Sequence, residues 1–398
     1  MSSANIEKKA LKLGYMPLSD CLPLLIAQSQ GFFKDEQLDV ELQQEVSWAN
    51  IRDKVIVGQL DGAHMLAPMI IASSLGLGGL KKGLMTAYSF ALNGNAFTVS
   101  NALYDELADI DPQQTDQAAT FKSLLSKRKT EGRNAPVIAT VYPYSCHSLQ
   151  LRYWLASAGI NPDLDIQLVV LPPSQMVDHL RLKHIDGFFA GAPWNSVAIQ
   201  NDLGRCLLTS PEIWQSAPEK VFGTTQDWHE KHPNTHAAII RALYKAGAWI
   251  EAHKEESIRL LADTLSTSSA WIDDNSLSPA ITGDFVYEKG SGPRRVENML
   301  VFHHSLANFP WLSHASWMIK QMQHWQFIPE DIDHDQLVTQ CYRPDIYRSA
   351  LQGIAPLPAQ NFKSEGANAQ NWHIETNQGA ILMYSDAFID NHKFAYSL

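Results

Sequence analysis

The chain repeats one pattern of residues, and this repeat constrains its fold more than any other feature. Segment 53–68 reads DKVIVGQLDGAHMLAP, and segment 178–193 reads DHLRLKHIDGFFAGAP. Each segment contains an Asp, one or two amphipathic helical turns, an Asp-Gly pair, a short apolar strand and Ala-Pro. The Asp-Gly pairs, Asp61-Gly62 and Asp186-Gly187, lie 125 residues apart.

The segments upstream of each Asp-Gly pair repeat at nearly the same spacing. Residues 11–17 (LKLGYMP) match residues 137–143 (VIATVYP), and residues 38–42 match residues 164–168. A unit of strand, turn, helix, strand, turn, helix and strand therefore occurs twice. Two copies at such a long period do not make a solenoid. They predict two similar α/β lobes with a ligand cleft between them.

Composition limits the classes of protein to which this chain can belong. Its 398 residues suffice for two ordinary domains. Hydrophobic residues make up 45% and charged residues 18%, as in globular proteins with a full core. The formal net charge is −11 and no basic run is present, which argues against direct binding of nucleic acid. Any control over RNA or DNA would have to act through a partner protein.

The cysteine and histidine patterns predict neither a metal site nor an enzyme. Four cysteines occur at positions Cys21, Cys146, Cys206 and Cys341. They form no CxxC pair or zinc spacing, which indicates reduced thiols in a cytosolic protein. Cys146 precedes His147, but neighbours in sequence rarely form a catalytic dyad. The fifteen histidines are scattered, and His303 and His304 are the only adjacent pair, in a segment that we expect to be helical. No cofactor is predicted.

The N-terminal residues and the apolar runs bear on location. Residues 1–17 lead almost directly into the first strand, with no apolar signal core and no lipobox cysteine. Every apolar run is shorter than the roughly 20 residues that a membrane-spanning helix needs. We therefore expect a cytoplasmic protein with no membrane span.

The order of the predicted elements gives the domain layout. Strands at 11–15, 38–43 and 63–66 alternate with helices at 22–31 and 48–57, with Ser47 as the N-cap of the latter. Two strands around residues 93–95 cross to the second lobe, whose helix 148–158 is capped by Ser145 or Ser148, and residues 211–225 cross back.

Helices at 121–129, 235–254, 256–265 and 311–325 complete the predicted elements. Lobe 1 is predicted to comprise residues 1–100 and 220–398, including a helical C-terminal part, and lobe 2 residues 101–219. Two lobes joined by two crossings are typical of the type II periplasmic-binding-protein fold. The apolar stretch 380–388 is expected to pack on a lobe.

Seven stretches spread over nearly the whole chain resemble the nitrate- and bicarbonate-binding proteins of ABC transporters, the NrtA/CmpA-like family. They are residues 14–33 (GYMPLSDCLPLLIAQSQGFF), 47–69 (SWANIRDKVIVGQLDGAHMLAPM), 92–100 (LNGNAFTVS), 147–166 (HSLQLRYWLASAGINPDLDI), 186–195 (DGFFAGAPWN), 218–228 (PEKVFGTTQDW) and 342–347 (YRPDIY). SWANIRDK and the DGAHMLAP run are specific to this resemblance.

One branch of that family resembles the chain in a further respect. The transporter members are exported and lipid-anchored, whereas residues 1–17 show no signal. With LNGNAFTVS, this resembles the cytoplasmic NasS-type sensors of nitrate and nitrite. The resemblance implies a partner, a NasT-type antiterminator with an RNA-binding domain. In that family the sensor holds the antiterminator idle and releases it when nitrate or nitrite binds, which controls nitrate assimilation genes.

The resemblance implies a ligand site at Trp48, Asn95, His147, Ser148 and Lys220. A planar monoanion such as nitrate needs several N–H donors and one positive charge, buried enough for both to count. The indole of Trp48 is a donor without acceptor capacity, and it stands at a helix start, where anions are favoured. Taken alone, however, Trp48 and His147 are ordinary core residues, and Lys220 is an ordinary surface lysine.

The repeat adds to this argument at His147. That residue follows the first strand of the second unit, so it mirrors the Asp20-Cys21 turn of the first unit and faces the cleft. Neutral histidine offers one N–H and charged histidine offers two. The backbone N–H of Ser148, at the start of the helix, is a further candidate donor.

Two positions distinguish between possible ligands. Lys220 occupies a position where the family's nitrate members have Lys, whereas the bicarbonate relative has an acidic residue and uses a metal. Lys220 therefore favours nitrate or nitrite. Asn95 stands where the transporters have Gln, which shortens the reach of the amide by about one methylene group. Ala192 stands where they usually have Glu, a difference that a partner-facing surface and a hinge would explain equally well.

Two alternatives remain. The chain is alternatively a substrate-binding component of a nitrate or bicarbonate ABC transporter, either alone or fused to an ATPase, although no Walker motif is present. The glycine-rich stretch 76–83 lacks the phosphate-loop spacing. An enzyme of thiamine-pyrimidine biosynthesis on the same fold shares the GY-P and GFF elements, but no cysteine-rich or multi-histidine cluster supports it.

Overall fold

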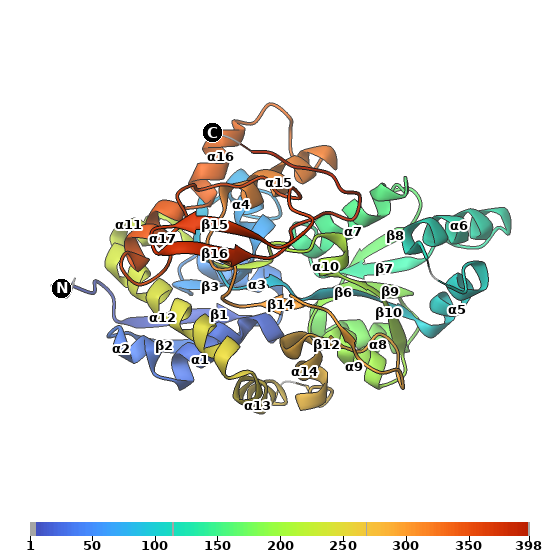
Figure 1. The fold of residues 1–398 in the computed structure, drawn as a ribbon, viewed down its shortest axis with the longest axis horizontal. Coiled ribbons are helices and arrows are strands. Elements are labelled where there is room, and N and C mark those ends of the chain that lie inside the picture. Colours follow the sequence, from blue (N-terminus) through green and yellow to red (C-terminus); the bar gives the residue numbers. More distant parts are fainter. Residues whose placement is uncertain (1–4, 114, 268, 397–398) are drawn as a thin grey trace.

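The computed structural model describes residues 5–113, 115–267 and 269–396 and contains two five-stranded sheets, one in each lobe (Figure 1). The first sheet has, in spatial order, the strands β2 (Asp39–Gln44), β1 (Ala10–Tyr15), β3 (Gly62–Leu66), β11 (Lys220–Thr225) and β4 (Leu84–Ser89). The second has the strands β8 (Gln167–Val170), β7 (Val137–Thr140), β9 (Gly187–Gly191), β6 (Asn95–Ser100) and β10 (Gly204–Thr209).

The two sheets have the same topology, as the sequence repeat predicts. β1 pairs in parallel with β2 and β3, and β7 pairs in parallel with β8 and β9. An antiparallel strand then follows in each sheet: β11 beside β3, and β6 beside β9. The chain enters the second lobe through β6 and returns to the first lobe through β11. Each of these crossing strands is the antiparallel strand of the sheet that it enters.

The repeated Asp-Gly pair has the same structural role in both lobes. Asp61 donates its backbone N–H to the Lys12 carbonyl (2.9 Å) and accepts the Lys12 N–H on its carboxylate (3.0 Å). Asp186 makes the same two bonds with Val137, at 2.7 and 2.8 Å. A side chain on Gly62 would lie 2.4 Å from the Phe222 ring of β11. The repeat therefore fixes the third strand of each unit against the first.

Helices cover both faces of each sheet. In the first lobe they are a 3-10 helix (Ser19–Cys21), α1 (Leu22–Ser29), α2 (Phe32–Asp35), α3 (Trp48–Ile56) and α4 (Ala67–Leu75). In the second lobe they are α5 (Asn101–Ile110), α6 (Gln117–Thr130), α7 (Cys146–Ser157), a 3-10 helix (Pro173–Gln175), α8 (Met176–Arg181), α9 (Trp194–Gln200) and α10 (Ser210–Ile213). α5 and α6 project from the far end of this lobe (Figure 1).

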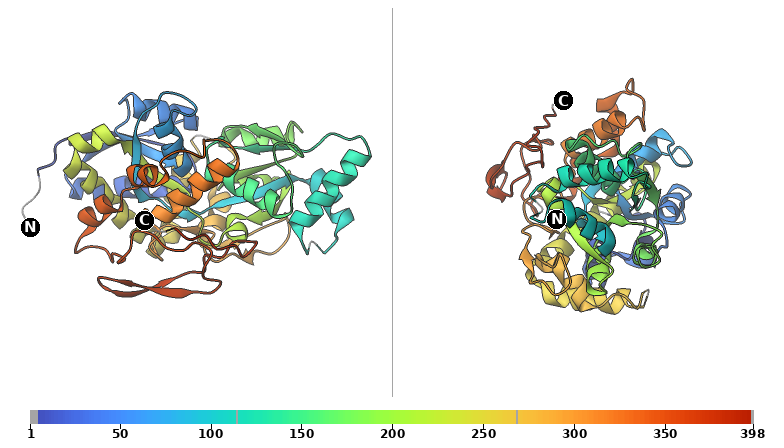
Figure 2. Two further views of the ribbon diagram at one scale, coloured as in Figure 1. Left: turned by 90° about the horizontal axis from the view of Figure 1, so that it is seen from above. Right: turned by 90° about the vertical axis from the view of Figure 1, so that its right-hand side faces the viewer.

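The chain after β11 is mainly helical. Its helices are α11 (Gln226–Lys231), α12 (Pro233–Ala252), α13 (Lys254–Leu265), α14 (Asp274–Thr282), α15 (Leu312–His324), α16 (His334–Cys341) and α17 (Pro344–Leu351). Short strands pair as β5 (Leu92–Asn93) with β14 (Leu300–Val301), β12 (Asp284–Phe285) with β13 (Arg294–Arg295), and β15 (Trp372–Thr376) with β16 (Gly379–Met383). The β15–β16 hairpin stands off one face of the molecule (Figure 2).

Helix starts follow the capping residues. The Ser47 hydroxyl accepts the Asn50 N–H at 3.2 Å, which confirms the predicted cap of α3. α7 begins at Cys146, two residues before the predicted start, because Ser145 is its cap and accepts the Ser148 N–H at 3.1 Å. α1 ends at Ser29, and Gly31 follows with φ 78°, a left-handed conformation that glycine adopts without strain.

Three sequence expectations differ from the structure. The residues Asn95–Ser100 form β6 of the second sheet, so the predicted boundary at residue 100 places a second-lobe strand in lobe 1. The predicted turn at residues 93–95 is present, but three strands surround it rather than two, because β4 ends at Ser89 and the separate strand β5 pairs with β14. His303 and His304 lie in a turn rather than a helix, since their N–H groups donate to the Glu251 carboxylate.

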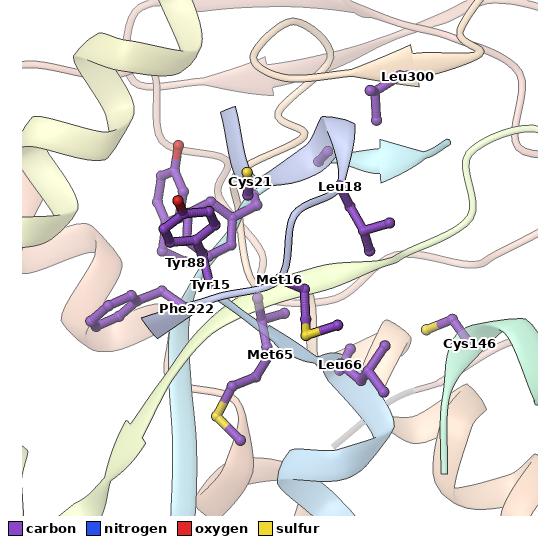
Figure 3. Close-up of a cluster of buried hydrophobic side chains, with 14 of the residues drawn as sticks. Tyr15, Met16, Leu18, Cys21, Met65, Leu66, Tyr88, Cys146, Phe222 and Leu300 are labelled. Carbon is purple, nitrogen blue, oxygen red and sulfur yellow. The ribbon is translucent and has the colours of Figure 1, made fainter. Parts of the chain in front are cut away.

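The main hydrophobic cluster extends across both lobes. It joins residues of β1, β3 and β11 to residues of α7 and α9. Figure 3 shows Cys146 of α7 across from Met16 and Leu66 of the first lobe. The predicted apolar stretch 380–388 contributes Phe388, whose ring lies 4.7 Å from Trp214 and 6.1 Å from Trp317. The end of this stretch therefore packs on the body of the molecule, as expected, whereas its first half lies in the β15–β16 hairpin, where Leu382 is exposed.

No helix in the described ranges is long and apolar enough to span a lipid bilayer.

The Asp-Gly clamp gives a first testable prediction. Asp186→Ala removes the acceptor of the Val137 N–H, so we expect the free energy of unfolding to fall by about 1–3 kcal/mol. Chemical denaturation followed by circular dichroism would measure this loss. Asp109→Ala, at an exposed position of α5, is the matched control and should change stability by less than about 0.5 kcal/mol. Equal stability of both variants would contradict the structural role of the clamp.

Candidate functional site

A fully buried lysine lies where the two crossing strands begin. Lys220 is the first residue of β11, and its ammonium group lies 2.7 Å from Asp20 Oδ2 and 2.5 Å from Glu219 Oε2. His147 Nε2 is 3.5 Å from the same nitrogen. Burying a charge is costly unless it is paired, so the two carboxylates are required to keep this ammonium in the interior.

The fold explains why these groups meet. Asn95 is the first residue of β6, as Lys220 is of β11, so the two crossings begin side by side at the junction of the lobes. His147 lies in the first turn of α7, directly after the first strand of the second lobe, and Asp20 lies after the first strand of the first lobe. The two residues thus occupy equivalent places in the repeated units, and both lie next to the ammonium group of Lys220.

Asn95 and Glu219 form the other side of the site. Asn95 Nδ2 donates to Glu219 Oε1 at 2.5 Å, and both residues are buried. The side-chain oxygen of Asn95 has no hydrogen-bond partner among the described residues. His147 Nδ1 lies 3.9 Å from the same Glu219 oxygen.

The missing side chain of Gly191 marks the point on which these groups converge. A Cβ at this last residue of β9 would lie 3.4 Å from Lys220 Nζ, 3.4 Å from Asn95 Oδ1 and 3.7 Å from His147 Nε2. None of these distances is a clash. Glycine therefore leaves room beside one cation, one amide and one imidazole.

The first lobe adds a layer behind Asp20. His64 Nε2 lies 3.0 Å from Asp20 Oδ1, and the imidazole packs 5.6 Å from the Trp48 ring and 5.2 Å from the Phe90 ring. The indole N–H of Trp48 is buried and finds no hydrogen-bond partner in the part of the chain that the structure describes. Trp48 therefore packs against His64, which in turn contacts Asp20 of the site. This indole N–H could donate to a small acceptor.

Burial and charge shift the pKa values in this cluster in different directions. Burial raises the pKa of Asp20, but the charge of Lys220 and a hydrogen bond from His64 outweigh burial and hold that pKa below its usual range. For Lys220, burial lowers the pKa, but Asp20 and Glu219 raise it overall. Burial dominates at Glu219 and raises its pKa despite Lys220. Burial also lowers the pKa of His64 and, together with Lys220, of His147, so both imidazoles are neutral.

The predicted residues and the observed cluster overlap in part. The structure brings Asn95, His147 and Lys220 together and places Trp48 behind them. The Ser148 N–H already donates to Ser145, so its role in a ligand site stays a prediction. The prediction lacked three residues that complete the cluster: Asp20, His64 and Glu219. All three lie in the stretches quoted for the family resemblance, which was the available signal.

Contacts between the lobes surround the cluster. Arg52 of α3 donates to the Tyr142 hydroxyl at 2.5 Å, and the Ser19 N–H donates to the Ala192 carbonyl at 2.9 Å. Side chains on Gly78 or Gly79 would lie 2.9 Å from the Arg52 guanidinium, so the glycine-rich stretch 76–83 packs closely over that contact. The groups of the cluster are therefore buried at contacts between the two lobes.

The described residues contain no group of three or more His, Cys, Asp or Glu side chains arranged to hold a metal ion.

The model of the NMT1-like family matches residues 4–266. The nitrate/nitrite binding protein NrtA of Nostoc sp. is 30% identical over 370 residues, which cover 90% of this chain and 81% of that protein. The chain belongs to the family of NrtA-type nitrate-binding proteins. These relatives are named as binding proteins, so the family assignment implies no catalytic residues.

Two further relatives extend the family comparison. The nitrate import ATP-binding protein NrtC of Synechocystis sp. is 34% identical over 360 residues, 89% of this chain but 52% of NrtC, so the chain spans about half of that relative. The crystal structure of the periplasmic nitrate-binding protein NrtA from Synechocystis matches with a TM-score of 0.84 at 25% identity and covers 98% of this chain and 96% of that one. The predicted two-lobed periplasmic-binding-protein fold is confirmed.

The buried imidazoles predict how stability depends on pH. Burial holds the pKa values of His64, His147, His236 and His314 below the ordinary value of about 6.5. Because the unfolded chain then binds more protons below that pH, the free energy of unfolding falls as pH drops from about 7 to about 5.

Thermal and chemical unfolding across this pH range would measure that slope. In His314→Gln, outside the site, we expect the slope to be shallower by up to about 1.4 kcal/mol per pH unit, the contribution of one titrating group. His373→Gln, at an exposed strand position, is the control and should keep the wild-type slope. A wild-type stability that is flat or rises toward pH 5 would contradict burial of neutral histidines.

Proposed function

We propose that the chain binds nitrate or nitrite at the enclosed cluster between its lobes. The observation that carries this proposal is the convergence of Lys220 Nζ, Asn95 and His147 on the vacant side-chain position of Gly191. A small planar monoanion needs one positive charge and several polar hydrogens in a buried setting. Lys220 supplies the charge, and the side chains of Asn95 and His147 each carry an N–H that can turn toward the same position. The relatives named for nitrate or nitrite support the same ligand class.

Lobe closure supplies the means of signalling. Asp20, His64 and Trp48 come from the first lobe, whereas His147 and Gly191 come from the second. An anion held by groups from both lobes favours their closed arrangement. To move an equilibrium from 1:99 to 99:1, the anion must favour one state by roughly 5.5 kcal/mol. An ion of four atoms or fewer reaches that value only by using nearly every donor, so partial switching is consistent with this site.

We propose further that the chain acts as a cytoplasmic sensor that holds a NasT-type RNA-binding antiterminator inactive and releases it when the anion binds. Support comes from the resemblance of residues 92–100 to the sensor branch, including Asn95 where transporters have Gln. The formal net charge of −11 fits control of RNA through a partner rather than direct contact. Size-exclusion chromatography of the co-purified pair tests this: we expect one complex without anion and two separate peaks with nitrite.

A transporter component is the second candidate. It is favoured by the match to half of NrtC, a protein named for nitrate import. The two candidates share the ligand and differ in the partner. A chain that binds nitrite but forms no complex with the antiterminator, and instead binds the membrane subunits of an importer, would exclude the sensor and support the transporter.

Gly191→Ala is the sharpest test of the ligand site. The added methyl group fits without a clash, leaves every charge of the cluster in place, and occupies the proposed ligand position. We expect isothermal titration calorimetry to show nitrate and nitrite binding to wild type and at least tenfold weaker binding to Gly191→Ala, with similar melting temperatures. Gly292→Ala, where a Cβ would meet nothing within 4 Å, is the matched control and should bind as wild type.

Lys220→Ala tests whether the positive charge of the site is needed for anion binding. Loss of the ammonium group should abolish nitrate and nitrite binding, and it should also destabilise the protein by about 3–5 kcal/mol, because two buried carboxylates lose their partner. Calorimetry with bicarbonate and chloride completes the series. Wild-type protein that binds neither nitrogen anion, or only bicarbonate with a divalent cation, would contradict the proposed ligand.

A further inference from the structure

The amide of Asn95 is oriented by its contact with Glu219. Asn95 Nδ2 donates to Glu219 Oε1, and Asn95 Oδ1 faces the Gly191 position with no partner. An ionised carboxylate only accepts hydrogen bonds, so it requires the N–H₂ side of the amide. The nitrogen and oxygen of a side-chain amide are told apart by their hydrogen-bond partners. Here an ionised Glu219 places the Asn95 nitrogen toward the carboxylate and the oxygen toward Gly191.

This orientation opposes the binding of an anion. Nitrate and nitrite oxygens only accept hydrogen bonds, and the group that Asn95 presents to the Gly191 position is itself an acceptor. A buried acceptor facing another acceptor leaves both unsatisfied, which weakens binding. The site in this state therefore lacks one of the donors that the proposed ligand requires.

We propose that anion binding is coupled to uptake of one proton by Glu219, which turns the Asn95 amide so that it donates to the anion. The proton comes from solvent and forms an O–H bond on the Glu219 carboxyl group. That O–H then donates to Asn95 Oδ1, and Nδ2 faces the Gly191 position. No other bond forms or breaks. Glu219 is thus a positioning residue, and this inference rests on the proposed anion ligand.

The net charge of the cluster also favours uptake of a proton together with the anion. Lys220 supplies the ammonium group of the cluster, which lies between the carboxylates of Asp20 and Glu219. With both carboxylates ionised, the cluster already carries one net negative charge, and an anion alone would add a second in a buried setting. Entry of the anion together with a proton leaves the net charge unchanged, which avoids that cost.

Glu219 is the group in this cluster suited to take up the proton. The titratable groups that face it are Lys220, Asp20, His147, Cys146 and Tyr342. Lys220 and Asp20 are held charged by each other, and burial keeps the other three neutral. Burial acts on both carboxyl groups, but only at Glu219 does it outweigh Lys220, so the pKa of Glu219 is raised overall whereas that of Asp20 is lowered.

Calorimetric titration with sodium nitrite and sodium nitrate tests the coupling. At each pH between about 6 and 8.5, the titration is run in two buffers with different ionisation enthalpies, and the difference in heat gives the number of protons taken up per anion. Above the pKa of Glu219 in the free protein, we expect uptake of about one proton in wild type. Affinity should then fall about tenfold for each unit rise in pH.

Glu219→Gln separates the coupling from binding itself. Gln mimics the protonated carboxyl group, so we expect no proton uptake and an affinity that is independent of pH. Glu365→Gln is the matched control: Glu365 is also buried beside a lysine, Lys363, but outside this cluster, and the variant should take up protons as wild type does.

Each outcome has a distinct meaning. Binding without proton uptake in wild type, or a Glu219→Gln variant with the wild-type pH dependence, would overturn the coupling and leave the proposed ligand intact. The wild-type proton count decides the question even if Glu219→Gln does not fold. Absence of nitrite and nitrate binding at every pH would instead overturn the proposed function and the coupling with it.

Discussion

The buried ammonium group of Lys220 is the interaction on which the rest of the site depends. An ion with no exposed surface costs several kcal/mol unless charges and hydrogen bonds surround it. Asp20 and Glu219 provide the charges, His64 and Asn95 hold those two carboxylates, and His147 borders the ammonium group. Groups from both lobes are therefore held in one network, and any anion that enters must be accommodated within its charge balance.

The duplicated unit explains how such a network forms from distant parts of the chain. Each lobe uses its Asp-Gly pair to fix three parallel strands and then receives one antiparallel strand from the crossing. The crossings begin at Asn95 and Lys220, so two residues 125 positions apart meet at the junction. Arg52 of the first lobe donates to the Tyr142 hydroxyl of the second, a further contact that holds the two halves together.

The sequence predicts the two lobes well because the repeat constrains strands and turns locally. The caps at Ser47 and Ser145 likewise follow from local hydrogen bonding. The boundary predicted at residue 100 places β6 in the wrong lobe, because the sequence of a crossing strand does not indicate which sheet the strand joins. The predicted site also omits Asp20, His64 and Glu219. An ionisable residue in a strand or turn is expected to face solvent unless its partner in the folded chain is known.

The most direct test of this account is a crystal structure of the protein with bound nitrate. The account predicts electron density for a planar anion beside Gly191, within hydrogen-bonding distance of Lys220 Nζ and His147 and with the Asn95 amide nitrogen directed toward it. Density for the anion at another place in the molecule, or an unoccupied site beside Gly191 in crystals grown at saturating nitrate, would contradict the central claim that this cluster is the ligand site.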